Sequence, residues 1–124
     1  MTEGYAGWLA FAMQFFDHQW TGRWGAHVRE KWSLPGQSRV NLDALPSYYM
    51  KRQAKVTYMW DPIAVENRNV TGTNCLLWGN DYPHVEGSFP DSQNWVDKQF
   101  SGVSETEIDT MVRLNAASIF GLTP

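Results

Sequence analysis

The sequence predicts an α/β fold with a parallel sheet, and three features of its middle region predict it. Residues 55–60 carry β-branched and aromatic side chains at alternate positions, as a half-buried strand does. Residues 75–79 form a short apolar run, which is typical of a strand buried on both faces. Between them, Asp61-Pro62 is typical of the start of a helix. A strand, a helix and a strand in this order predict a βαβ unit with a right-handed crossover.

The region before the first strand predicts two helices separated by a loop. Residues 5–20 are apolar at helical spacing, and the expected inner face consists of Tyr5, Trp8, Leu9, Ala12, Phe15, Phe16 and Gln19. Because Phe11 and Met13 make the other side apolar too, we expect this helix to be covered by another part of the protein. Residues 21–45 predict a long loop, and loops of this length are typically lids, binding loops or mobile segments. Residues 46–52 predict a short helix with Pro46 in its first turn.

The region after the first strand predicts a helix, a turn, the second strand and a polar loop. The helix is expected from Pro62 to about Asn69, and the turn at residues 71–74. The polar loop follows Gly79, and a further helix is expected from Ser92 to Phe100.

The last predicted helix has clear signals at both ends. Ser104 and Glu107 form a capping box, and Val103 can pack against Ile108 across it. Gly121 is a typical helix end. The expected inner face consists of Ile108, Met111, Val112, Asn115 and Ile119. The polar side chain of Asn115 on this face is expected to bond a nearby backbone group.

Length, charge and cysteine content limit the class of protein. The chain has 124 residues and a mass of 14.2 kDa, which predicts one domain. A net charge of −3 and a pI near 5.5, without a basic stripe, argue against a nucleic-acid partner. No apolar run approaches membrane-spanning length, and Met1–Gly4 does not resemble a secretion signal, so we expect no membrane partner. The single Cys75 excludes an internal disulfide and indicates a reducing compartment, which we take to be the cytoplasm.

The aromatic content is high, with seven Trp residues and 15% aromatic residues overall. Such a content predicts either a heavily aromatic core, or an aromatic pocket or subunit contact. Composition alone does not separate these interpretations.

Asp81 and His84 are the strongest candidates for chemistry. Asp81 stands two residues beyond the second strand, and ligands of parallel α/β sheets gather at the carboxyl ends of strands. An aspartate there can bind a metal ion or transfer a proton, whereas an ordinary loop Asp caps backbone N–H groups and a loop His is solvated. His18 and His27 show no metal-ligand spacing, and Cys75 in an apolar strand predicts inert packing.

The segment Leu77-Trp78-Gly79-Asn80-Asp81-Tyr82-Pro83-His84 resembles a motif of the amidohydrolase-related family, in the branch of the aminocarboxymuconate-semialdehyde and resorcylate decarboxylases. That family ends its eighth barrel strand in Gly-Ser/Thr-Asp-Tyr-Pro-His, and Asn80 stands here in place of Ser or Thr. Further similar stretches follow the family's order along almost the whole chain: Glu3–Trp8 with Asp17, Pro46–Tyr49, Trp60–Pro62, Glu86–Ser92 and Asn115–Leu122.

The resemblance implies that residues 1–124 are the C-terminal part of a (β/α)₈ TIM barrel, incomplete in this chain. It implies a metal-dependent hydrolase or non-oxidative decarboxylase that acts on a small, carboxylate-bearing or cyclic substrate. Asp81 is then the eighth-strand aspartate, which binds a divalent metal (Zn or Mn) or transfers a proton beside it, and His84 lies at the mouth of the catalytic site.

The barrel and its metal site are incomplete in this sequence. A whole barrel takes roughly 250 residues, and the family's other metal-ligating histidines have no counterpart among the three His residues here. We therefore expect the chain to be a fragment that lacks the N-terminal barrel portion, binds no metal alone and is inactive alone. The alternative is a non-catalytic half-barrel that self-associates or pairs with another chain. A carbohydrate-binding module would fit the Trp content but not the βαβ pattern.

Overall fold

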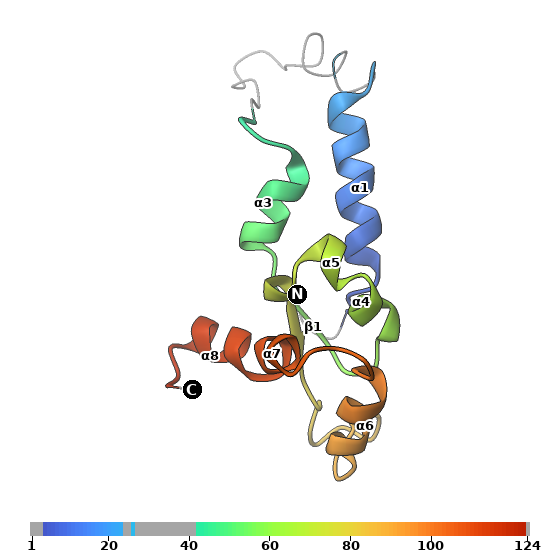
Figure 1. The fold of residues 1–124 in the computed structure, drawn as a ribbon, viewed down its shortest axis with the longest axis vertical. Coiled ribbons are helices and arrows are strands. Elements are labelled where there is room, and N and C mark those ends of the chain that lie inside the picture. Colours follow the sequence, from blue (N-terminus) through green and yellow to red (C-terminus); the bar gives the residue numbers. More distant parts are fainter. Residues whose placement is uncertain (1–3, 24–25, 27–41, 124) are drawn as a thin grey trace.

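The computed structural model describes residues 4–23, 26 and 42–123. Most of the predicted loop at residues 21–45 therefore lies outside the described residues. In chain order the named elements are α1 (Trp8–Thr21), α3 (Pro46–Gln53), β1 (Val56–Tyr58), α4 (Pro62–Glu66), α5 (Arg68–Thr71), η1 (Thr73–Cys75), β2 (Leu76–Trp78), α6 (Ser92–Gln99), α7 (Glu105–Asp109), η2 (Thr110–Leu114) and α8 (Asn115–Phe120). In Figure 1, α1 and α3 lie side by side and extend from one end of the strand region, while α6 lies at the other end.

The predicted βαβ unit is present, with β1 and β2 paired in parallel. Val56 is opposite Leu76, and Tyr58 is opposite Trp78. One further backbone hydrogen bond joins the ends of the two strands, from the Gly79 N–H to the Tyr58 carbonyl at 3.0 Å. Consequently both strands end at the same edge, and the candidate loop starts directly from it.

Asp61 holds two helix starts at the carboxyl end of β1. Its Oδ1 accepts the Ala64 N–H at 3.0 Å, which is the predicted cap of α4. Its Oδ2 accepts the N–H groups of Ala6 at 2.6 Å and Gly7 at 2.8 Å, at the start of α1. Gln99 completes the arrangement, since its Oε1 accepts the Asp61 N–H at 3.2 Å. One buried carboxylate therefore fixes α1 relative to the βαβ unit.

The predicted inner face of α1 is correct at Leu9, which is buried, but wrong at its large aromatic residues, which are exposed. The buried residues are Ala6 just before the helix and Leu9, Ala10 and Met13 within it, which form a narrower stripe at i, i+3, i+4 and i+7. Phe15 and Phe16, expected inside, are 45% and 47% exposed. The helix carries two apolar stripes, and the stripe of smaller side chains packs against the rest of the described chain.

The connection between the strands differs from the expected single helix. It divides at Asn67, whose backbone (φ −83°, ψ 6°) separates α4 from α5. The expected turn at residues 71–74 is replaced by the end of α5, by Gly72 at φ 86° and by η1. Cys75 belongs to η1, so the second strand starts one residue later than predicted.

The core lies between the two strands and the helices on either side. Its buried members are Ala6, Leu9, Met13, Val56, Tyr58, Ala64, Val65, Cys75, Leu76, Phe100 and Met111. Five of the seven Trp residues lie in the described part of the chain, and none of them is buried. Among the aromatic residues in that part of the chain, Tyr58 and Phe100 are the buried members of this core, and Trp78 packs against it, so the described core is not heavily aromatic.

The C-terminal helices follow their local signals closely. Ser104 caps α7, because its hydroxyl oxygen accepts the Glu107 N–H at 3.4 Å, and the same hydroxyl donates to Glu107 Oε2 at 2.9 Å. Gly121 ends α8 at φ 64°, as predicted. Ile119, expected on the inner face, is 44% exposed. Asn115 is buried and donates to the carbonyls of Thr73 and Leu76, both at 2.8 Å, as predicted for a polar residue there.

No helix within the described residues combines the length and the apolarity needed to cross a membrane.

Candidate functional site

The candidate site lies in the loop that leaves β2, and this loop is closed by its own backbone. The Ser88 N–H donates to the Asn80 carbonyl at 3.0 Å, which brings the two ends of the loop together. Within it, the Tyr82 N–H donates to Asn80 Oδ1 at 3.1 Å, and the His84 N–H donates to the Asp81 carbonyl at 2.9 Å. The fold therefore holds residues 81–86 in a compact turn beside the end of β2.

Gly87 is the residue that allows this turn to close so tightly. A Cβ at this position would lie 2.7 Å from the Asn80 carbonyl oxygen, 3.0 Å from that of His84 and 3.1 Å from that of Asp81. These are backbone atoms that cannot move away cheaply. The absence of a side chain here lets the loop pack on itself.

Asp81 and His84, both predicted as site residues, are brought together. Asp81 Oδ2 lies 2.9 Å from His84 Nδ1. The Asp81 side chain is 15% exposed and the His84 side chain 60%. Asp81 adopts a left-handed backbone (φ 55°), which Asp tolerates better than most residues. The carboxylate orients the imidazole, as in pairs that transfer protons.

Glu86 joins this pair and was not predicted as a site residue. One ligand atom each from Asp81, His84 and Glu86 lies within 4.8 Å of the others. The spacing Asp-x-x-His-x-Glu within one loop could have suggested it, but the proximity depends on the turn that Gly87 permits. We define these three residues as the loop cluster.

The loop cluster offers two carboxylates and one imidazole. Zn and Mn both accept this mixture of oxygen and nitrogen ligands. The same groups can also transfer a proton, with the carboxylate of Asp81 stabilising a protonated His84. Among the described residues, the Asp81 carboxylate bonds the His84 imidazole at 2.9 Å.

The remaining candidates do not join the loop cluster. His18 is exposed on α1, and His27 lies outside the described residues. Cys75 is fully buried, and burial raises the pKa of its thiol, with Lys55 and Lys51 opposing that rise. This agrees with the predicted inert packing. Burial, with the charge of Asp61 adding to it, also raises the pKa of Tyr58 far above its ordinary value.

A scan against protein-family models finds no match. A search of curated proteins likewise finds no significant match. The resemblance to the amidohydrolase-related family thus depends on the residues quoted above.

Proposed function

We propose that this protein is the C-terminal part of a metal-dependent, amidohydrolase-related enzyme that hydrolyses or decarboxylates a small carboxylate-bearing or cyclic substrate. The observation that carries the proposal is the loop cluster at the carboxyl end of β2. Its position beside the end of β1 agrees with the place where parallel α/β folds bind ligands, since both strands end at one edge. The incomplete TIM barrel implied by the resemblance is part of the same proposal.

Asp81 is the proposed metal ligand, and His84 and Glu86 complete the donor set that this chain offers. The set fits a divalent ion because three ligand atoms of suitable type already lie within 4.8 Å of one another. A divalent ion held there would polarise a substrate carboxylate or activate a water molecule. His84 is proposed to take one of two roles, either as a ligand of the ion or, oriented by Asp81, as a proton carrier beside an ion held by the two carboxylates.

Further ligands are proposed to come from residues outside this chain. All three donors belong to one loop, and two of them, His84 and Glu86, are exposed. Catalytic zinc sites commonly draw about three protein ligands from several elements of a dry, shaped cavity. We therefore propose that this chain alone does not catalyse and that the missing N-terminal barrel portion completes the catalytic site.

The test starts from the native protein, captured from its source cells with an antibody raised against residues 42–123. The expected species has a mass of about 35–45 kDa, as a whole barrel with insertions requires. It contains divalent metal and releases either CO₂ or a hydrolysis product from a panel of cyclic carboxylates and amides. Asp81→Asn in that protein abolishes turnover. A species of 14.2 kDa without metal would contradict the proposal.

The alternative is a non-catalytic half-barrel that self-associates, and the outer face of α1 favours it. Phe11, Phe15 and Phe16 are 70%, 45% and 47% exposed. Phe11 and Phe15 stack on each other, with ring centroids 5.8 Å apart. Under this alternative, sedimentation finds a dimer that Phe11→Ser with Phe15→Ser dissociates, whereas Asp81→Asn leaves it intact.

The location proposed for the protein is the cytoplasm. Cys75 is a free, buried thiol, which agrees with a reducing compartment. Immunofluorescence with the same antibody tests this.

A further inference from the structure

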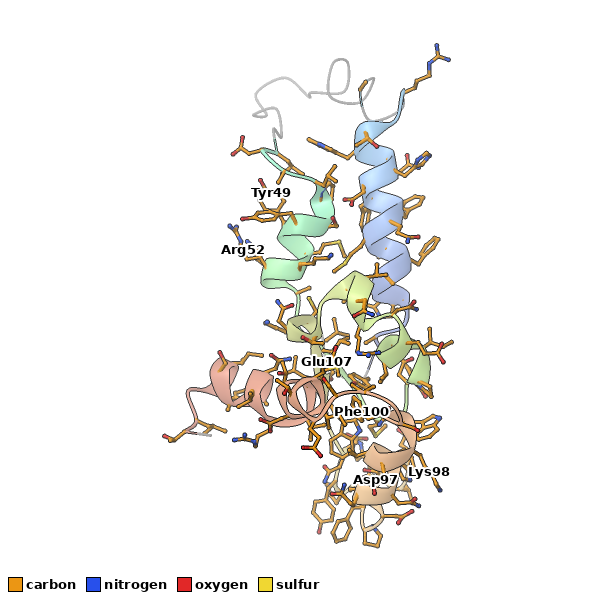
Figure 2. The ribbon with its side chains drawn as sticks, viewed as in Figure 1. Tyr49, Arg52, Asp97, Lys98, Phe100 and Glu107 are labelled. Atoms are coloured by element: carbon orange, nitrogen blue, oxygen red, sulfur yellow. The ribbon has the colours of Figure 1, made fainter. Side chains whose placement is uncertain are left out.

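A pocket of about 510 Å³ lies where β1 ends, next to the loop cluster, with which it shares Glu86. It is lined by Tyr5, Met59, Trp60, Glu86, Trp95 and Lys98. Trp95 and Lys98 are three residues apart on α6, so they share one face of that helix (Lys98 is labelled in Figure 2). Met59 and Trp60 directly follow β1.

Two of the pocket's aromatic rings form a corner. The rings of Trp60 and Trp95 meet edge to face, with centroids 5.8 Å apart and planes at 77°. Tyr5 adds a third ring and is 63% exposed, while Trp60 is 41% exposed. These rings therefore offer surfaces to the pocket instead of packing wholly into the core. The face of an exposed Trp or Tyr ring attracts a cation that lies within about 6 Å of the ring centroid, and most strongly when the cation is desolvated.

The pocket also carries one negative and one positive side chain. Glu86 and Lys98 are both exposed, and neither makes an ion pair within the described residues. The nearby backbone acceptor is already occupied, because the Met59 carbonyl accepts from Trp78 Nε1 and Gln99 Nε2, both at 2.9 Å. A ligand thus meets aromatic faces, a carboxylate and an ammonium group.

We propose that this pocket binds a small betaine-type zwitterion, meaning a quaternary ammonium group joined to a carboxylate. The alkylated ammonium lies against Trp60 and Trp95, with Glu86 supplying the opposite charge. The carboxylate pairs with Lys98. Each charged group of the pocket then faces its opposite, and no group of the ligand is left without a partner.

The chemistry of the walls favours a quaternary over a primary ammonium group. A primary ammonium has three N–H donors that need acceptors after they leave water. Among the charged and backbone acceptors named here, only Glu86 is available, because the Met59 carbonyl is already shared by two donors. A quaternary ammonium needs no hydrogen bond and loses little hydration against aromatic faces.

This inference does not depend on the proposed enzyme function, although Glu86 belongs to both sites. Binding is therefore measured in metal-free protein with a chelator present. Failure of the pocket leaves metal binding by the loop cluster untouched, and failure of metal binding leaves the pocket untouched.

The direct test compares three ligands by NMR of the seven Trp indole N–H signals. Glycine betaine carries both charges, choline carries only the cation, and 3,3-dimethylbutyrate has the betaine shape without the positive charge. We expect betaine to shift the signals of Trp60 and Trp95 saturably. We expect 3,3-dimethylbutyrate to bind with an affinity at least about tenfold lower than that of betaine. Equal binding of 3,3-dimethylbutyrate, which lacks the cation, or no shift with betaine, would overturn the proposal.

Two variants distinguish the contributions of the ammonium group and the carboxylate of the ligand to binding. Lys98→Gln should weaken betaine binding about tenfold and leave choline binding unchanged, because only the carboxylate loses its partner. Trp95→Leu should weaken both ligands. The controls are Lys51→Gln and Phe11→Leu, which remove an exposed cation and an exposed ring outside the pocket. An effect of either control as large as that of its partner variant would count against the assignment.

Discussion

Asp61 Oδ2 accepts the Ala6 N–H at 2.6 Å, joining two residues that are 55 positions apart. The same carboxylate accepts from Gly7 and from Ala64, at the starts of α1 and α4. A single buried side chain thus orders the N-terminal helix on the βαβ unit. That unit in turn positions the loop cluster and the pocket lined by Trp60 and Trp95 at the edge of the sheet where both strands end.

Replacing Asp61 with Ala should destabilise the protein by about 3 kcal/mol. The substitution removes one helix cap and leaves the buried Ala6 N–H without its acceptor. Urea unfolding followed by circular dichroism measures the loss. The matched control is Asp91→Ala, because Asp91 precedes α6 without a side-chain cap bond and should cost under about 0.5 kcal/mol. An equal loss of unfolding free energy in the two variants would contradict the interpretation that Asp61 holds the starts of both α1 and α4.

Asn115→Asp should destabilise the protein more at neutral pH than under acid conditions. Asn115 Nδ2 donates to the Thr73 and Leu76 carbonyls, and an ionised carboxyl placed there would face two acceptors. The pKa of the introduced carboxyl is therefore higher in the folded than in the unfolded state. The loss of unfolding free energy grows as the pH rises above the pKa of this carboxyl in the unfolded state. We expect a cost of about 3 kcal/mol at pH 7 and a smaller one near pH 4. Asn69→Asp, at an exposed position, is the control and should show little pH dependence.

The stability contributed by Glu107 should disappear in acid. Hydrogen bonds from Arg68, and then Ser104, lower the pKa of Glu107 below its ordinary 4.5 (Glu107 is labelled in Figure 2). A carboxyl group whose pKa is lower in the folded state stabilises that state at pH values above its pKa in the unfolded state. This stability is lost as the pH falls through its pKa in the folded state. Glu107→Gln should therefore lower the urea midpoint at pH 7 but not near pH 3.

Glu105→Gln is the control for that comparison. Glu105 lies in the same first turn of α7, so its charge interacts with the helix dipole as that of Glu107 does. Unlike Glu107, Glu105 makes no ion pair among the described residues. The two variants should differ at pH 7. If they lower the midpoint equally, the Arg68 bond is not the source of the effect.

Cys75 should react with a thiol reagent only when the protein opens. Its side chain is fully buried and burial raises the pKa of the thiol, so little thiolate is accessible. We expect the native protein to react about 100-fold or more slowly than the same protein in urea. Complete reaction of the native protein within the mixing time would show that the described packing around η1 is wrong.

Local signals predicted the elements of this chain well because each depends on neighbouring residues. Pro46 opens α3, Asp61 caps α4, and Gly121 ends α8, as their sequence contexts indicate. The parallel pairing of the strands was also predictable, from the order of strand, helix and strand. The implied barrel and enzyme family remain predictions.

The missed features depend on contacts between distant segments. Either apolar stripe of α1 could have faced inward, and the choice is made by packing against the rest of the chain. The second role of Asp61 requires Ala6, 55 residues away. Glu86 reaches Asp81 only because Gly87 lets the loop close, which spacing alone did not reveal.

The most direct test of the central claim is a Mn²⁺ titration of the protein, followed by paramagnetic broadening of assigned NMR signals. In the protein completed by its N-terminal barrel portion, the account predicts that broadening centres on Asp81, His84 and Glu86. It also predicts that Asp81→Asn weakens this binding about tenfold or more, whereas Asp97→Asn on α6 leaves it unchanged. Broadening that is diffuse over exposed carboxylates, or that is unaffected by Asp81→Asn, would contradict a metal site in this loop.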